Sequence, residues 1–402
     1  MKNIIYITIL TVLFIFSNAC QEKIVKGMYE YDTAFFAANG IEYIELSDSL
    51  GQSRVLIVPA YQGRVMTSST KGKKGISYGW INYDLIESKE IKSNFNPVGG
   101  EERFWLGPEG GPYSLYFDSN KEQVFSNWRV PSLIDTESFD VVEKSSGKIK
   151  FSKQAVIENA NGTLFKIDIQ RSVSLLEKNE VEKVFNIEIE KSLNFVAYKS
   201  ENCITNIGKD KWDKKTGVPS IWMLSMFDVG KSNIVFIPYK SNAVGSIVKD
   251  DYFGKVPSER LVIENDIIYF KVDGKLRSKI GIPFHRAKNI LGSIDIERNL
   301  LTLMCYNLPE TEESYVNGQW GNQEDAFNGD VINSYNDGPV EDGTIMGPFY
   351  ELETSSPALD LCVGEKYKHE QCIVHIEGSK REIEKIISHL FEINLEKIST
   401  IF

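Results

Sequence analysis

Residues 164–171 read LFKIDIQR and residues 184–190 read VFNIEIE, and in both segments apolar and polar side chains alternate. Alternation with period two is typical of a strand with one buried face. Residues 148–151, KIKF, begin this run, and an Asn-Gly turn at residues 161–162 divides it. Because no helical pattern lies between the strands, this part of the chain predicts an antiparallel β-sandwich.

The pattern extends toward both ends. Residues 29–59 are short and strand-like, residues 195–202 lead out of the central run, and residues 349–354, FYELET, predict a further strand. No linker and no fixed-period repeat interrupts the pattern. The sequence therefore predicts one mainly β domain over residues 29–402, a large antiparallel β-sandwich.

A short helix is predicted near the C-terminus. Ser379 and Glu382 have the spacing of a capping box. The apolar residues that follow at helical spacing are Ile383, Ile386, Ile387, Leu390 and Phe391. His389 lies off that stripe, so we expect it to be exposed.

Composition limits the partners. Of the 402 residues, 42% are hydrophobic and 25% are charged, and the formal net charge is -11 without a basic block. This balance argues against binding to nucleic acid or to an anionic membrane surface. It is compatible with a neutral ligand.

The N-terminus has the pattern of an export signal. Lys2 precedes an apolar run over residues 4–16, and small or polar residues then lead to Cys20. This arrangement resembles a bacterial lipoprotein signal at residues 1–19, with lipid attached to Cys20 and a tether over residues 20–28. It implies a protein exported and lipid-anchored to a bacterial membrane, periplasmic or at the cell surface.

Four further cysteines lack metal-binding spacing. Cys203, Cys305, Cys362 and Cys372 are expected to be small buried residues. A Cys362–Cys372 bridge across a hairpin is the alternative for an exported protein; we predict against it.

Residues 329–358, GDVINSYNDGPVEDGTIMGPFYELETSSPA, gather acids and amides around the predicted strand at 349–354. In an extended chain, Glu351 and Glu353 share one face. A solvated strand face is the simple interpretation. The density of polar groups nearby, which includes Asp330, Asn336 and Asp337, favours a binding or catalytic site.

Residues 99–112, GGEERFWLGPEGGP, form the second unusual stretch. Its glycines and prolines permit tight turns, while its Trp and charged residues suit a sugar, because an aromatic plane stacks on the ring and charged groups bind its hydroxyls. A structural loop around a core Trp is the alternative. The candidate substrate-binding residues of the chain are Arg64, Glu101, Glu102, Arg103, Trp105, Asp330, Asn336 and Asp337.

Zinc and serine-hydrolase sites are not predicted, because HxH, HExxH and GxSxG patterns are missing. The oxygen atoms near Asp330 and Asp337 are of the kind that Ca²⁺ takes, although Asp and Asn are also usual in turns. We predict no cofactor, with Ca²⁺ as the one candidate. Carboxylates and one or two late histidines remain for acid–base work.

Near its C-terminus the chain resembles the galactose mutarotase-like (aldose 1-epimerase) superfamily. The resemblance lies in Leu352-Glu353-Thr354, Pro357-Ala358 and Gly364-Glu365-Lys366-Tyr367. With its GPEGG and GPFYELE motifs, the chain also resembles a group of uncharacterised secreted proteins of that superfamily. The resemblance implies a large twisted β-sandwich with a sugar-binding groove.

The resemblance implies that Glu353 is the general base and that Arg64 or Arg103 is the substrate arginine. Epimerases of the superfamily protonate the ring oxygen with a mid-chain histidine, but no histidine precedes His285 here. His285, His369 or a carboxylic acid would replace it. Glu351 is a candidate because two close carboxylates separate their pKa values.

The first hypothesis is therefore a carbohydrate-active protein that transfers protons at or near the anomeric centre, with Glu353, Glu351 and His369 as catalytic residues. The alternative is a noncatalytic carbohydrate-binding lipoprotein, favoured by the missing histidine. A purely structural surface role leaves the polar cluster unexplained. We expect Glu353 to lie in a concave site with Glu351, Arg103 and one late histidine.

Overall fold

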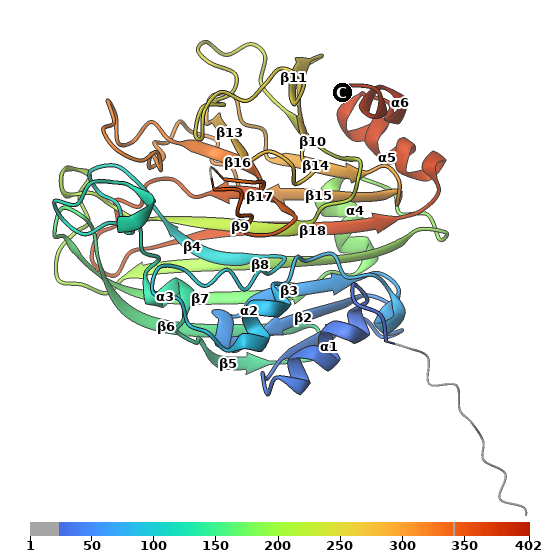
Figure 1. Ribbon diagram of the computed structural model, residues 1–402, viewed down its shortest axis with the longest axis horizontal. Coiled ribbons are helices and arrows are strands. Elements are labelled where there is room, and N and C mark those ends of the chain that lie inside the picture. The colour runs from blue at the N-terminus through green and yellow to red at the C-terminus, as the bar shows by residue number, and fades with distance from the viewer. Residues whose placement is uncertain (1–23, 341) are drawn as a thin grey trace, which may run out of the picture.

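Three antiparallel sheets dominate the computed structural model, which describes residues 24–340 and 342–402 (Figure 1). The predicted signal segment 1–19, Cys20 and the first part of the predicted tether lie outside the described residues. The mainly β, antiparallel architecture predicted from the alternating segments is confirmed.

The largest sheet has ten strands in the order β11-β12-β10-β14-β15-β18-β8-β7-β6-β5. In chain order these are β5 Asp140–Lys144, β6 Lys148–Glu158, β7 Leu164–Leu175, β8 Asn194–Asn206, β10 Asn233–Pro238, β11 Leu261–Glu264, β12 Ile267–Lys271, β14 Ile290–Asp295, β15 Leu300–Tyr306 and β18 Lys366–Glu377. The predicted Asn-Gly turn joins β6 to β7, with Gly162 at a φ of 82°.

A five-stranded sheet in the order β13-β16-β17-β9-β4 carries most residues of the candidate site. Its strands are β4 Arg103–Gly107, β9 Ser220–Asp228, β13 Ser278–Pro283, β16 Asp330–Asn336 and β17 Phe349–Ser355. The third sheet, near the N-terminus, consists of β1 Ile44–Ser47, β2 Arg54–Val58 and β3 Arg64–Ser69. The predicted strand at 349–354 is confirmed as β17.

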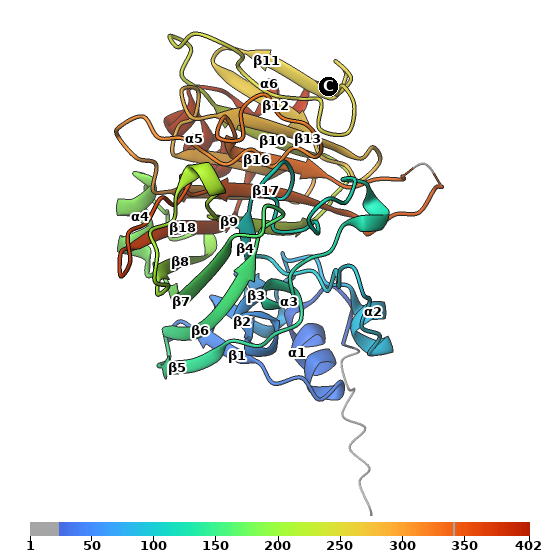
Figure 2. The ribbon, with the colours of Figure 1, turned by 90° about the vertical axis from the view of Figure 1, so that its left-hand side faces the viewer.

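The five-stranded sheet packs on the ten-stranded sheet through one face (Figure 2). The layer between them is mostly apolar but includes polar contacts. The Tyr350 hydroxyl lies 2.8 Å from Oγ of Ser293, and Nε2 of Gln371 donates to Oγ of Ser225 at 3.3 Å. This packing leaves the opposite face of the five-stranded sheet to be covered by loops.

Helices cover the outer face of the ten-stranded sheet. They are α4 Lys178–Phe185, α5 Lys380–Phe391 and α6 Leu395–Ser399. The capping box of α5 is present, since Ser379 and Glu382 exchange hydrogen bonds, and its buried residues are Ile383, Ile386, Ile387 and Phe391. Each such burial contributes about 1.5–3 kcal/mol. The predicted C-terminal helix and the exposure of His389 are confirmed.

The remaining helices are α1 Tyr29–Ala38, α2 Tyr83–Ser88 and α3 Ser132–Asp135. The prediction of strand-like structure over residues 29–59 is wrong at α1. There Tyr29 and Phe36 are buried together against β2 and β3, and Glu30 and Asp32 lie in the first turn, where acids favour a helix.

The predicted strand at residues 184–190 is also wrong. Glu177 and Glu180 form a capping box that begins α4, and Val181 and Phe185 are buried four residues apart. Ile187 and Ile189 then continue into the same apolar layer without joining a sheet. The alternation therefore predicted buried residues correctly but predicted the wrong secondary structure.

All four cysteines among the described residues are free thiols. Cys372 is buried, as expected, whereas Cys362 is exposed, contrary to the expectation. None of the helices in residues 24–340 and 342–402 is long and apolar enough to cross a membrane.

Candidate functional site

The two faces of β17 have different surroundings. Glu353 lies opposite Asn333 of β16 and Leu224 of β9, on the face that loops cover. Tyr350, Leu352 and Thr354 point to the ten-stranded sheet. The solvated interpretation of Glu351 and Glu353 is wrong, because they are only 5% and 0% exposed.

The carboxylate of Glu353 is held through one oxygen. Its Oε2 accepts hydrogen bonds from Nε1 of Trp222 at 2.8 Å and from Nζ of Lys279 at 2.9 Å. Its Oε1 has no hydrogen-bond partner among the described residues. An unmade hydrogen bond on a buried carboxylate is costly, so this oxygen is an acceptor suited to a ligand.

Lys279 on β13 is buried with its charge. Its side chain is 11% exposed, and its ammonium lies 4.9 Å from the ring centre of Trp222 and 5.6 Å from that of Tyr252. Burial lowers the pKa of Lys279, but Glu353 and Glu109 outweigh it and the net pKa is raised. The lysine therefore acts here as a fixed positive charge.

A small cavity lies beside Glu353's partners, Trp222 and Lys279. Its volume is about 40 Å³, and its lining includes Glu109, Trp222, Tyr252, Lys279, Asp330 and Asn333. Glu353 is not itself in the lining, and we call this the Glu353 cavity because Trp222 and Lys279, which donate to Glu353, line it. A cavity of this size holds a few water molecules. These residues come from three strands and two loops, so the tertiary fold alone brings them together.

Glu109 supplies a second carboxyl to this cavity. Burial raises the pKa of Glu109, and nearby Glu353 raises it further, while Lys279 and a hydrogen bond from Trp320 act in the opposite direction. A carboxyl with a raised pKa can hold a proton at neutral pH and donate it. Glu353 and Glu109 are thus two carboxyl groups with different surroundings.

Glu351 lies two residues before Glu353 on β17 and forms an ion pair. Nη2 of Arg103 donates to its Oε1 at 2.7 Å. Burial raises the pKa of Glu351 to about 7, against the opposing effect of Arg103. The guanidinium of Arg103 lies 4.3 Å from the ring centre of Trp105, and its Nε and Nη1 have no partner within the described part of the chain.

His369 lies on the opposite face of β17 from Glu353. Its Nε2 is 2.9 Å from Oγ1 of Thr354, in the layer between the two sheets. Burial lowers the pKa of His369 to about 3. No histidine is among the residues that line the Glu353 cavity, so the expectation of a late histidine in this site is wrong.

Glu101 and Glu102 lie in buried polar contacts elsewhere. Oε1 of Glu101 is 3.0 Å from Nε2 of His375. Glu102 pairs with Arg171 and accepts from Oγ of Ser200 at 2.7 Å. The fold thus separates both acids from the Glu353 cavity, whose lining includes neither.

Arg64 is also buried and donates to the carbonyl of Gly99 at 2.7 Å and to Gln62 at 2.8 Å. Burial lowers its pKa to about 9. It is absent from the lining of the Glu353 cavity.

The acids and amides of residues 329–358 divide between the cavity and the turns. Asp330 lines the cavity and accepts from the hydroxyl of Tyr252. Asn336 bonds the backbone at Gly274 and Leu276, and Asp337 accepts from the backbone of Gly347 at 2.9 Å. No cluster of three or more His, Cys, Asp or Glu side chains that could hold a metal occurs among residues 24–340 and 342–402.

Sequence reasoning missed Lys279, Trp222 and Tyr252. Residues 273–279 have the sequence of a charged turn, DGKLRSK, yet Lys279 lies in β13 opposite Tyr335 of β16. The one available signal was the alternation within the β13 segment, SKIGIP. Glu109 was visible within GPEGG, but nothing distinguished it from the other acids there.

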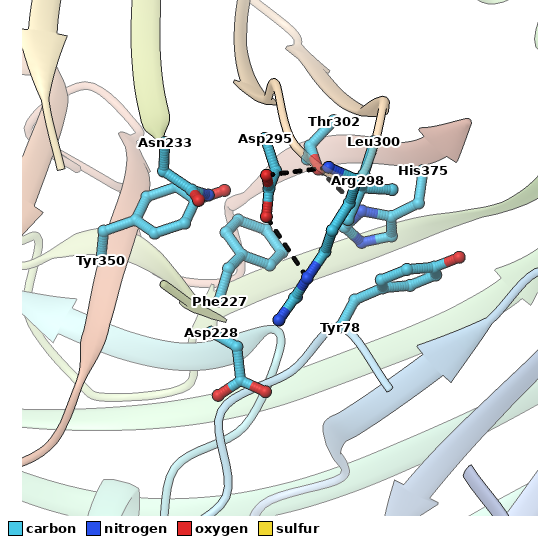
Figure 3. Close-up of a pocket in the computed structure, with 10 residues that line it drawn as sticks. All are labelled: Tyr78, Phe227, Asp228, Asn233, Asp295, Arg298, Leu300, Thr302, Tyr350 and His375. Carbon is cyan, nitrogen blue, oxygen red and sulfur yellow. Dashed lines mark hydrogen bonds and ion pairs between the residues drawn. The ribbon is translucent and has the colours of Figure 1, made fainter. Parts of the chain in front are cut away.

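A second cavity lies where the three sheets meet. Figure 3 shows its lining, which includes Tyr78, Asp228, Asp295, Arg298 and His375. Its volume is about 10 Å³, roughly that of one water molecule. In this smaller cavity Nδ1 of His375 lies 2.8 Å from Oγ1 of Thr302, and Nε of Arg298 lies 3.4 Å from Oδ2 of Asp295.

Comparison with known proteins gives a family but no activity. The model of a family of unknown function, DUF6786, matches residues 27–402. No curated protein matches the sequence.

Three solved structures are similar in fold. The Slr1438 protein from Synechocystis sp. PCC 6803 is 12% identical, with 84% of this chain and 96% of that one covered and a TM-score of 0.49. A putative aldose 1-epimerase from Escherichia coli K12 is 9% identical, with 85% and 100% covered and a TM-score of 0.48. A galactose mutarotase-like protein from Lactobacillus casei is 10% identical, with 84% and 99% covered and a TM-score of 0.45. Likenesses this distant do not say what the site does.

Proposed function

The chain belongs to the family of unknown function DUF6786, and we propose that it is a carbohydrate-active protein that transfers protons at or near the anomeric centre of a sugar. The observation that carries the proposal is Glu353, a fully buried carboxylate with one oxygen fixed by two donors and the other unpartnered. A second carboxyl, Glu109, lines the cavity beside it.

The reaction that fits these groups is ring opening and closure of an aldose. Oε1 of Glu353 takes the proton of the anomeric hydroxyl while Glu109 gives a proton to the ring oxygen. The bond between the anomeric carbon and the ring oxygen breaks as the carbonyl forms. Rotation of that carbonyl and the reverse proton transfers give the other anomer, so each carboxyl recovers its starting state.

Lys279 and Trp222 position the base. Because both donate to Oε2 of Glu353, they direct Oε1 away from themselves and hold the side chain in one orientation. Trp222 and Tyr252 also supply aromatic faces, which suit the C–H groups of a sugar ring. Polar groups from Asp330 and Asn333 offer partners for hydroxyls.

The cavity of about 40 Å³ is too small for a pyranose ring. Binding therefore requires the covering loops to part, above all the segment that carries Tyr252. Tyr252 is held by its hydrogen bond to Asp330 and by contact with the ammonium of Lys249, 4.9 Å from its ring centre. Both contacts involve side chains and can break without unfolding a strand.

Noncatalytic sugar binding is the second candidate. It is favoured by the ion pair of Lys279 with the proposed base and by the location of His369 outside the cavity. A binder would need the same cavity and the same hydrogen-bonding groups but no proton transfer. The two candidates therefore differ in turnover, not in the location of the site.

The test is anomer exchange, measured by polarimetry or exchange NMR on freshly dissolved hexoses, pentoses and uronic acids. The wild type should accelerate exchange for at least one sugar, and Glu353→Gln should lower that rate at least about 10²-fold. Glu122→Gln, a change at an exposed site, should leave it unchanged.

Binding of the same sugars is measured by calorimetry. Binding without acceleration would favour the noncatalytic candidate. If no sugar binds and no exchange rate changes, both candidates are wrong.

We also propose export and lipid attachment at Cys20, on the strength of the N-terminal sequence. In a bacterial host, the wild type should fractionate with membranes and incorporate a radiolabelled fatty acid. Cys20→Ser should lose the label. Label retained in that variant would contradict the proposal.

A further inference from the structure

Cys305 and Cys372 face each other on neighbouring strands. They are partners in the antiparallel register of β15 and β18. Residues directly opposite in such a pair have Cα atoms about 4.5–5.5 Å apart, and disulfides span Cα distances of about 4.4–6.8 Å. Cys372 therefore faces Cys305 across the sheet, not Cys362.

Cys372 also acts on the Cys305 thiol. Together with burial, it raises the pKa of that thiol well above its ordinary value. Both side chains point to the outer face of the ten-stranded sheet, in the apolar layer under the helices.

The pair lies at the margin of that helical cover. On one side, Leu303 and Val374 are fully buried. On the other side, the ladder continues into Lys199 and Glu370, an ion pair at 3.1 Å with both side chains partly exposed. Cys372 is buried, but Cys305 is partly accessible, so a small disulfide reagent can reach one of the two sulfurs.

We propose that Cys305 and Cys372 are a redox-active dithiol that forms a cross-strand disulfide with a small-molecule disulfide as oxidant. The Cys305 thiol loses its proton, a step that its raised pKa makes slow at neutral pH, and the thiolate attacks one sulfur of glutathione disulfide and releases one glutathione thiolate. The thiolate of Cys372 then attacks Cys305 and displaces the second. Two protein thiols are oxidised and one glutathione disulfide is reduced to two glutathione thiols, which take up the two protons that the protein thiols lose.

Cys203 and Cys362 provide an internal control. Cys203 lies opposite Lys368 on β18 and Gln170 on β7, and Cys362 lies in an exposed segment before β18. Neither has a cysteine opposite it in the described strands. Under conditions that link Cys305 to Cys372, Cys203 and Cys362 should remain separate thiols or form mixed disulfides with glutathione.

The experiment equilibrates the folded wild-type protein with glutathione disulfide, blocks free thiols by alkylation and maps the peptides by mass spectrometry. We expect a Cys305–Cys372 linkage that dithiothreitol reverses. Because a cross-link over a long loop stabilises, oxidation should raise Tm by at least about 4 °C. Cys362→Ser should behave like the wild type, and Cys305→Ser should show neither the linkage nor the rise in Tm.

Three results would overturn the proposal. These are separate alkylation of both thiols after equilibration, glutathione held on Cys305 without transfer to Cys372, and linkage found only after denaturation. The peptide map of the wild type decides among them even if Cys305→Ser does not fold. None of these results bears on sugar exchange, so this proposal and the proposed function fail independently.

Discussion

Glu102 and Glu353 are both fully buried, yet their oxygens meet different surroundings. Glu102 has partners on both oxygens, from Arg171 and from Ser200. Glu353 has two donors on Oε2 and none among the described residues on Oε1. The difference shows that burial of an acid does not by itself mark a site. Glu353 combines an unpartnered oxygen with two hydrogen-bond donors, Trp222 and Lys279, that line a cavity.

The largest expected effect is a difference in protein stability between substitutions of these two acids. Glu102→Gln leaves the fully buried charge of Arg171 unpaired, so the free energy of unfolding should fall by about 3–5 kcal/mol. Glu353→Gln leaves Lys279, which keeps some contact with solvent, and should cost no more than about 2 kcal/mol. Urea denaturation at pH 7 measures both. Equal losses of unfolding free energy in the two variants would contradict the proposed difference between Glu102 and Glu353.

The next effect concerns the proton donor. Glu109→Gln should lower the exchange rate at least about 10²-fold while sugar affinity changes less than about threefold. Glu351→Gln should lower the rate less, because Glu351 pairs with Arg103 whereas Glu109 lines the cavity. If the order of the two variants is reversed, Glu351 is the donor.

A smaller effect tests how Glu353 is positioned. Trp222→Phe removes the hydrogen bond to Oε2, and loss of a bond to a charged group should lower the exchange rate by about 10-fold. Trp105→Phe is the matched control, because Nε1 of Trp105 has no partner among the residues described. Its rate should change less than about threefold. Similar losses in both variants would mean that ring packing, not the hydrogen bond, matters.

The smallest effect is a pH dependence of stability. The pKa of Glu351 is raised to about 7, so the unfolded chain loses this proton at lower pH than the folded one. Stability is therefore lost as pH rises, by about 1 kcal/mol between pH 6 and 7.5. Urea denaturation of Glu351→Gln should show a flatter dependence than the wild type. Parallel curves would contradict the raised pKa.

Several parts of the fold follow from local pattern. The strand over residues 349–354, the turn at 161–162 and the C-terminal helix were predicted because each depends on neighbours in the sequence. α1 and α4 were missed because their apolar residues fit two periods, and contacts with distant elements selected the helix.

The site was predicted only in part. Glu353 and its pleat neighbour Glu351 follow from alternation and from the resemblance of the Leu-Glu-Thr strand. Lys279 could not be predicted, because it lies 74 residues away from Glu353 in sequence and only the register of β13 on β16 and β17 brings them together. His369 was expected beside Glu353, but the face it occupies depends on β18 packing below β17.

The sequence by itself determined that the chain is mainly β, that β17 presents two glutamates on one face, and that a capped helix lies near the C-terminus. These depend on period two, on capping and on turn residues, which act over a few positions. The tertiary structure decided which glutamate has an unpartnered oxygen, which lysine pairs with that glutamate and which two cysteines lie opposite each other. Those contacts join distant segments, and their partners are set by strand order and packing, which no local pattern specifies.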